Sequence, residues 1–269
     1  MLTRTLVGIG IVALALAGLW LGGLWLVVVY TVFFVLAVQE LGRAFSAKGK
    51  TGFWLPAYIF AALFPITYYF GGFNALYLFV FFLACFVATV VGQVLTAKGD
   101  FEAVPYSLLP FAYPLLPGVT LVLLYFGLPE DIFLTATALA LFAPALGDTL
   151  AYFGGVLLGR HKLCPAISPK KTVEGALFGL LGGTLLGLLL WLAQPWWGGA
   201  VGFWPLLILG LVCGAMGQVG DLFASCLKRY AGVKDFSGIF PGHGGILDRI
   251  DSQLLCAPVV LAYFMLTAL

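Results

Sequence analysis

Residues 75–97 read ALYLFVFFLACFVATVVGQVLTA, a run of mostly apolar and small residues without a charged side chain. The hydrocarbon core of a bilayer is about 30 Å thick, and an α-helix needs about 20 apolar residues to cross it. In that core each backbone N–H and C=O must find a partner within the protein, and a helix supplies these partners along its own length. The segment therefore predicts a membrane-spanning helix.

Eight further apolar stretches of comparable length occur in the chain. They cover residues 5–22, 24–45, 54–71, 107–126, 131–158, 173–193, 203–228 and 249–268. We predict an all-α polytopic integral membrane protein with about nine transmembrane helices. Residues 1–105 would form an N-terminal region of about four helices, and residues 106–269 a C-terminal region of about five helices with two cytoplasmic loops. We expect both regions to form one integrated membrane unit.

The composition of the whole chain agrees with this class. Of 269 residues, 62% are hydrophobic and only 9% are charged, whereas a soluble domain carries about 25% charged residues. The formal net charge of +2 is too small for the basic face of a nucleic-acid-binding protein, so no nucleic-acid partner is expected. The five cysteines form no CxxC pair, which argues against structural zinc.

The basic residues predict the orientation. If the N-terminus is cytoplasmic and nine spans alternate, all thirteen Lys and Arg residues fall on the cytoplasmic side, as the positive-inside tendency requires. They are Arg4, Arg43, Lys48, Lys50, Lys98, Arg160, Lys162, Lys170, Lys171, Lys228, Arg229, Lys234 and Arg249. The C-terminus would then lie outside. We expect a multi-pass protein of the cell (inner) membrane with its active site on the cytoplasmic side.

A glycine stripe marks the span 173–193, where Gly175, Gly179, Gly183 and Gly187 recur every fourth residue. Small residues at this spacing let helix backbones approach closely in a membrane. We interpret the stripe as a packing surface. The packing can occur within one chain or between two, so a homodimer stays open.

Four aspartates lie inside spans or at their ends, where a charged group is costly and usually retained for function. Asp148 lies within the span 131–158, and Asp221 lies within the span 203–228. Asp248 and Asp251 are three residues apart at the last span, so they project from one helical face. Three polar residues, Ser225, Lys228 and Arg229, follow Asp221 at spacings that place them on its face.

The segment before residue 173 concentrates lysines and hydroxyls at a predicted helix start. Ser168 or Thr172 is expected to cap that helix. Lys170 and Lys171 offer donors to a polyphosphate, and a helix N-terminus attracts anions. Taken alone, the segment also fits a capped helix with ordinary cytoplasmic lysines.

A glycine-rich segment, residues 234–246, joins the last two spans and reads KDFSGIFPGHGGI. It matches neither a P-loop nor a dinucleotide-binding fingerprint. Its flexible backbone could bring Asp221, before it, and Asp248, after it, around a metal ion. Carboxylate oxygens together with substrate phosphates are the ligands that Mg²⁺ prefers.

Acids, basic residues and a glycine loop on one side of a membrane indicate Mg²⁺-assisted phosphoryl or nucleotidyl transfer. Metal and basic side chains neutralise the charge that develops on the transferred group. An ion-coupled transporter is the alternative from another class, because acids inside helices also serve ion coupling.

The sequence resembles the phosphatidate cytidylyltransferases, also called CDP-diacylglycerol synthases. The signature begins with SCLKR at residues 225–229, continues through Asp235 and Ser237-Gly238, and ends with PGHGGILDRID at residues 241–251. A second region of similarity covers Asp148-Thr149, Ala151-Tyr152, residues 159–163 and residues 168–175. The chain departs from the pattern at Ala224, where the family often has Glu.

The resemblance implies a role for each matching residue. Asp221 and Asp248 would ligate Mg²⁺, with a monovalent cation such as K⁺ as a further candidate. The implied catalytic set is Asp221, Asp248, Lys228, Arg249 and Asp251. The implied substrate-binding set is Asp148, Tyr152, Ser168, Lys170, Lys171, Thr172, Glu174, Ser225, Arg229, His243, Gly244 and Gly245.

The implied reaction converts CTP and phosphatidate, a membrane lipid, to CDP-diacylglycerol and pyrophosphate in phospholipid biosynthesis. Nothing in the sequence identifies the lipid chains, so an ether lipid or a polyprenol acceptor stays an alternative.

Overall fold

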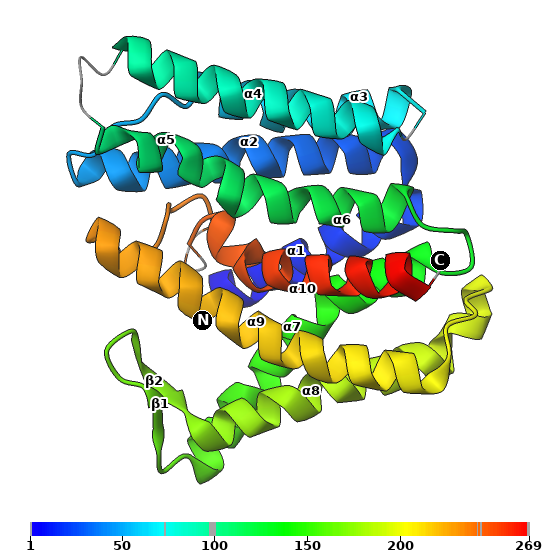
Figure 1. The fold of residues 1–269 in the computed structure, drawn as a ribbon. Coiled ribbons are helices and arrows are strands. Elements are labelled where there is room, and N and C mark those ends of the chain that lie inside the picture. Colours follow the sequence, from blue (N-terminus) through cyan, green and yellow to red (C-terminus); the bar gives the residue numbers. More distant parts are fainter. Residues whose placement is uncertain (1, 73, 97–100, 241, 243, 268–269) are drawn as a thin grey trace. The chain divides into compact units, whose positions relative to one another are not determined.

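The computed structural model describes residues 2–72, 74–96, 101–240, 242 and 244–267, and most of them are helical (Figure 1). The helices are α1 (Leu2–Leu21), α2 (Gly23–Ala47), α3 (Leu55–Phe70), α4 (Ala75–Thr96), α5 (Ala103–Pro110), α6 (Leu116–Phe126), α7 (Phe133–Leu158), α8 (Val173–Ala193), α9 (Phe203–Ala231) and α10 (Leu247–Thr267). A π-helical segment, Phe111–Leu115, joins α5 to α6, and a 3-10 turn, Gln194–Trp197, follows α8.

Each of the nine predicted ranges falls on a helix, with α5 and α6 together forming the fifth. Within the part of the chain that the structure describes, seven helical segments are long and apolar enough to cross a membrane, whereas Val12–Leu21 and Leu55–Phe70 are apolar but shorter. The all-α polytopic class is therefore confirmed. It remains a prediction that the chain crosses the membrane nine times, with the N-terminus in the cytoplasm and the C-terminus outside.

A short hairpin adds to the helices. Strand β1 (Lys162–Cys164) pairs antiparallel with β2 (Ser168–Thr172), with Lys162 opposite Thr172. The sequence predicted only a loop between α7 and α8. The hairpin carries Lys170 and Lys171 and leads directly into α8.

The chain divides into two compact units. The first comprises Met1–Val119 and Tyr230–Arg249, and the second comprises Thr120–Arg229 and Ile250–Leu269. This division differs from the predicted boundary at residue 105, because the segment after α9 belongs with the N-terminal helices. Helices α9 and α10 each contribute residues to both units.

In the first unit, α3 packs against both α2 and α4, and phenylalanines fill the space between these helices. Phe34, Phe60, Phe64 and Phe111 are all fully buried, and the rings of Phe60 and Phe64 stack at 5.0 Å. Such aromatic side chains bury large apolar areas.

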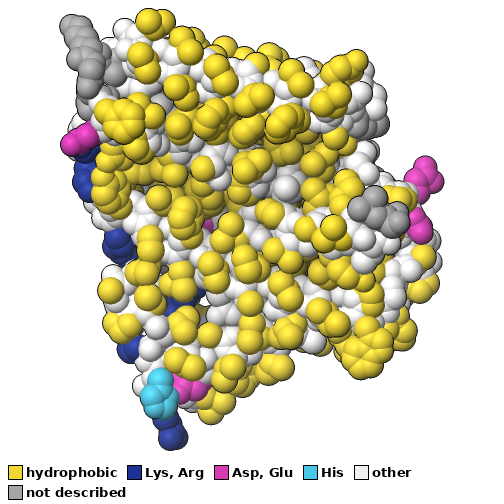
Figure 2. All heavy atoms as spheres, viewed as in Figure 1, with side chains coloured by type: hydrophobic (Ala, Val, Ile, Leu, Met, Phe, Trp, Pro, Cys, Tyr) yellow, Lys and Arg dark blue, Asp and Glu magenta, His cyan; other side chains and the backbone are white. Residues whose placement is uncertain are grey.

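Helix α4 has its polar face inside and its apolar face outside. Gln93 is buried and its Oε1 accepts hydrogen bonds from the Phe53 N–H at 3.0 Å and the Ser107 hydroxyl at 2.6 Å. The opposite stripe of large apolar residues is exposed: Leu76, Phe79, Val80, Leu83, Val87 and Val91. Hydrophobic side chains cover much of the face in Figure 2 as well. This arrangement suits a lipid surrounding, where polar groups must be satisfied internally.

In the second unit, the glycine stripe of α8 packs against its own chain. A Cβ at Gly183 would lie 2.8 Å from the Gly214 nitrogen of α9 and closer still to the Gly210 carbonyl oxygen. A Cβ at Gly182 would lie 2.8 Å from Gly147 Cα of α7. The predicted packing stripe is thus confirmed within one chain, and the homodimer stays a prediction.

Candidate functional site

The predicted site residues are distributed over both compact units. Asp148, Lys171, Asp221, Lys228 and Asp251 belong to the second unit, whereas Asp248 and Arg249 belong to the first. Each group is described within its own unit.

In the second unit, the hairpin supplies a lysine to the carboxylate of α9. The Nζ of Lys171 lies 2.5 Å from Oδ2 of Asp221. Both side chains are partly buried, with exposed fractions of 23% and 32%, so the pair is shielded more than a surface ion pair. Neighbouring residues of a strand point to opposite faces, and Lys170 is exposed. The structure therefore brings together two residues that lie 50 positions apart in the sequence.

A close approach of α9 and α10 brings a second carboxylate into this group. A Cβ at Gly220 would lie 2.5 Å from the Asp251 carbonyl oxygen and 2.9 Å from Ser252 Cα. Only glycine fits there, and Asp221 is the next residue. Asp251 is 7% exposed, and its carboxylate interacts electrostatically with Asp221, Lys228 and Asp148. We call Asp148, Lys171, Asp221, Lys228 and Asp251 the acidic cluster.

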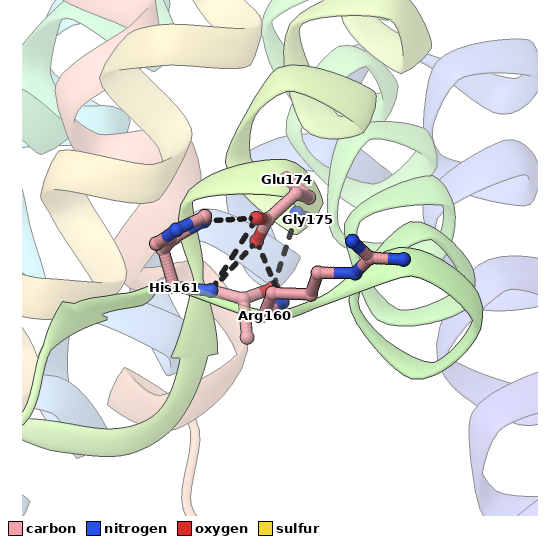
Figure 3. A network of polar contacts seen from close by, with 5 residues as sticks. Arg160, His161, Glu174 and Gly175 are labelled. Atoms are coloured by element: carbon pink, nitrogen blue, oxygen red, sulfur yellow. Dashed lines mark hydrogen bonds and ion pairs between the residues drawn. The ribbon is translucent and has the colours of Figure 1, made fainter.

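Two side chains that were predicted to bind substrate, Thr172 and Glu174, hold the start of α8 in place. The hydroxyl of Thr172 accepts a hydrogen bond from the Gly175 N–H at 3.1 Å, which confirms the predicted cap. Glu174 accepts hydrogen bonds from the backbone N–H groups of Arg160 and His161, and its Oε1 lies 2.6 Å from His161 Nδ1 (Figure 3). These contacts tie the segment between α7 and β1 to the first turn of α8.

Replacing Thr172 by Ala is expected to lower the stability of the chain. The Gly175 N–H would lose its acceptor, and removing an N-cap hydroxyl costs about 1 kcal/mol. Thermal unfolding in detergent should show a lower midpoint for Thr172→Ala than for Thr172→Ser, which keeps the hydroxyl. Equal midpoints for the two variants would contradict the capping role.

In the first unit, Asp248 lies in the first turn of α10 and is 7% exposed. Its Oδ2 accepts hydrogen bonds from the backbone N–H groups of Phe236 and Gly245, each at 2.9 Å. Gly244 has a φ of +81°, which favours glycine, and its Cβ would lie 2.6 Å from Asp248 Oδ2. The glycine-rich segment therefore folds around the Asp248 carboxylate.

The remaining predicted residues are placed as follows. Tyr152 is exposed on α7, and Asp148 is exposed one turn before it. Ser225 and Arg229 lie on α9 near Lys228, and Ser168 lies at the start of β2. Arg249 follows Asp248 on α10. His243 lies outside the described residues.

A further functional candidate, in α2, was not predicted from the sequence. Glu40 is 1% exposed and accepts hydrogen bonds from Ile246 N–H at 2.9 Å and Leu247 N–H at 2.8 Å. A single acid within the predicted span 24–45 was the signal for it, since charges in spans are usually retained for function.

The described residues hold no group of three or more His, Cys, Asp and Glu side chains arranged to bind a metal ion. Carboxylates are nevertheless available in both units. The acidic cluster contains three aspartates and two lysines, so its carboxylates outnumber its cations. An oxygen-rich site with surplus negative charge is chemically suited to Mg²⁺.

Known proteins resemble this chain over less than half of its length. A protein named phosphatidate cytidylyltransferase from Staphylococcus saprophyticus is 45% identical over 115 residues, and one from Staphylococcus epidermidis is 46% identical over 115 residues. Another of the same name from Staphylococcus aureus is 45% identical over 119 residues. In each comparison the match spans 43% of this chain and 43% of the relative's length.

The match to a family extends further than these pairwise similarities. The sequence profile described as the cytidylyltransferase family covers residues 2–267, which include both compact units and every predicted site residue. The chain therefore belongs to the cytidylyltransferase family.

Proposed function

We propose that the chain transfers the cytidylyl group of CTP to phosphatidate, giving CDP-diacylglycerol and pyrophosphate. The observation that carries this proposal is the pairing of Lys171 with Asp221 beside the buried Asp251. The curated relatives are named for this activity. CDP-diacylglycerol is a phospholipid precursor, so the chain would act in phospholipid biosynthesis.

The reaction needs charge neutralisation more than a protein nucleophile. A phosphate oxygen of the lipid attacks the α-phosphorus of CTP, and the bond between this phosphorus and the pyrophosphate oxygen breaks. The lysines of the acidic cluster, Lys171 and Lys228, would offset negative charge on the phosphates in this step. Positioning and electrostatics account for most of the catalysis in such transfers.

Asp221 and Asp248 would hold the metal, and Asp251 and Asp148 would support it or orient substrate. Mg²⁺, when bound, supplies Lewis acidity to the phosphoryl oxygens and shields their charge. The surplus of carboxylates over lysines in the acidic cluster supports a cation there. A monovalent cation such as K⁺ is part of the same proposal.

The location follows from the chemistry of the substrates. The chain has apolar helices of membrane-spanning length, and its relatives are bacterial proteins, so we place it in the cell membrane. The lipid would enter from the bilayer, and CTP would arrive from the cytoplasm, where the positive-inside tendency puts the lysines. We therefore propose an active site on the cytoplasmic side.

Metal removal tests the proposal. Purified chain in detergent, supplied with labelled CTP, phosphatidate and Mg²⁺, is expected to form a labelled lipid product. EDTA should abolish that product, and added Mg²⁺ should restore it, because the carboxylates of the cluster repel the phosphates without a cation. A product that survives EDTA would contradict the metal assignment. An ether-lipid phosphate or a polyprenyl phosphate can be added in competition with phosphatidate. If the chain uses one of these lipids in preference to phosphatidate, that lipid is the acceptor.

A further inference from the structure

Glu40 is a buried acid on an apolar helix. It lies on α2, within a segment of membrane-spanning length, and is 1% exposed. A carboxylate at such a place is costly unless hydrogen bonds compensate for its lost hydration. The structure shows where those hydrogen bonds come from, and all of their donors belong to one segment of the chain.

The donors lie in the glycine-rich segment and at the start of α10. Oε1 of Glu40 accepts from the Ser237 hydroxyl at 2.5 Å and from the Ile246 N–H at 2.9 Å, and Oε2 accepts from the Leu247 N–H at 2.8 Å. The first N–H groups of a helix lack partners within it, and a negative charge there is favourable. Glu40 therefore caps α10 from a helix about 200 positions away in the sequence.

Asp248 holds the same segment through further hydrogen bonds. Asp248 accepts from Phe236 and Gly245, which neighbour the Glu40 partners Ser237 and Ile246 in the sequence. A Cβ at Gly245 would collide with the Glu40 carboxylate. Two buried carboxylates thus hold the segment in one conformation. A substitution at Glu40 is therefore expected to change the position of Asp248.

We propose that Glu40 is a positioning residue for the reaction: it holds the glycine-rich segment and the start of α10 so that Asp248 is presented in one orientation. The proposal rests on the proposed function, in which Asp248 is a metal ligand. Neither the family membership nor the proposed chemistry assigns a role to Glu40, and it acts through Asp248 rather than on substrate.

The Glu40→Gln variant tests the proposal. Glutamine keeps the shape of the side chain but replaces one acceptor oxygen by an NH₂ group, which cannot accept from a backbone N–H. Hydrogen exchange of peptides covering Ile246 and Leu247, measured without CTP or Mg²⁺, should become about tenfold faster or more. The Mg²⁺ concentration for half-maximal rate should rise about 10- to 100-fold, because groups that orient metal ligands have effects of this size.

Two further variants make the test specific. Glu102→Gln changes an exposed glutamate of the same unit, which pairs with Lys50 at 3.1 Å, and should leave exchange and Mg²⁺ dependence unchanged. Ser237→Ala removes one donor to Glu40 and keeps the backbone contacts, so it should shift Mg²⁺ dependence in the same direction by less. If Glu40→Gln does not fold, the Ser237→Ala result decides.

The outcomes separate this proposal from the proposed function. An active wild-type chain whose Glu40→Gln and Ser237→Ala variants keep normal Mg²⁺ dependence would overturn the positioning role, with or without faster exchange. A folded wild-type chain that forms no CDP-lipid would refute the proposed function, and the exchange measurement would still show whether Glu40 holds the segment. Faster exchange together with a raised Mg²⁺ requirement would support both.

Discussion

The Asp221→Asn variant should lose CDP-diacylglycerol synthesis by about a thousandfold or more while remaining folded. Asparagine has nearly the same shape but no charge, so it cannot balance Lys171, which lies 2.5 Å from the Asp221 carboxylate, and it is a poor ligand for Mg²⁺. A metal ion supplies several kcal/mol of transition-state stabilisation, and each 1.36 kcal/mol corresponds to about tenfold in rate. The measurement is the initial rate of labelled lipid formation at saturating CTP and phosphatidate.

A matched control separates this effect from general damage. Asp131→Asn makes the same chemical change at an exposed aspartate of the same unit, whose hydrogen bond to the Ala200 N–H uses the backbone carbonyl. We expect wild-type activity from it. Near-wild-type turnover of Asp221→Asn at saturating Mg²⁺ would remove Asp221 from the metal site.

The second large effect is expected on folding, from Gly183→Leu in the glycine stripe of α8. Its new Cβ would lie 2.8 Å from the Gly214 nitrogen and closer still to the Gly210 carbonyl. These are backbone atoms, so they cannot rotate away and α8 must separate from α9. Overpacking costs about 1–3 kcal/mol and occasionally more, and this would lower the unfolding midpoint by roughly 2–12 °C. Thermal unfolding in detergent measures the shift.

The control for this substitution is Gly10→Leu on α1. A Cβ at Gly10 meets nothing within 4 Å, so the leucine is expected to point into open space and leave the midpoint unchanged. If both variants unfold at the same temperature, the close contact of α8 with α9 does not contribute to stability.

The sequence predicted the helices well because each one depends on local composition. The uncharged run 75–97 became α4, Ala75–Thr96, and the stripe from Gly175 to Gly187 became the contact of α8 with α7 and α9. Thr172 caps α8 as its position before an apolar helix predicts. Such features are decided within a few turns of chain, which a single sequence displays.

Contacts between distant segments were not predictable in the same way. Glu40 contacts residues 197 to 207 positions away, and no period or spacing connects such pairs. The rule that singled out Asp148 and Asp221 also applies to Glu40, but its partners are mostly backbone N–H groups, which carry no sequence signature. The hairpin of β1 and β2 was not predicted, because its strands have only three and five residues.

The sequence predicted individual residues of the candidate site but not which of them contact one another. Asp221, Asp248 and Lys171 were all expected near phosphate or metal, and the structure pairs Lys171 with Asp221. Glu174 also has a structural role, because its carboxylate holds Arg160 and His161 to the first turn of α8. A direct role of Glu174 in substrate binding stays a prediction.

The most direct test of the central claim measures both products in one sample. Purified wild-type chain is incubated with CTP, phosphatidate and Mg²⁺, and the CDP-diacylglycerol formed is quantified by mass spectrometry alongside the pyrophosphate released. We expect equal amounts of the two products, and we expect Asp221→Asn to lose both. Pyrophosphate without the lipid product, or neither product from demonstrably folded protein, would contradict this expectation.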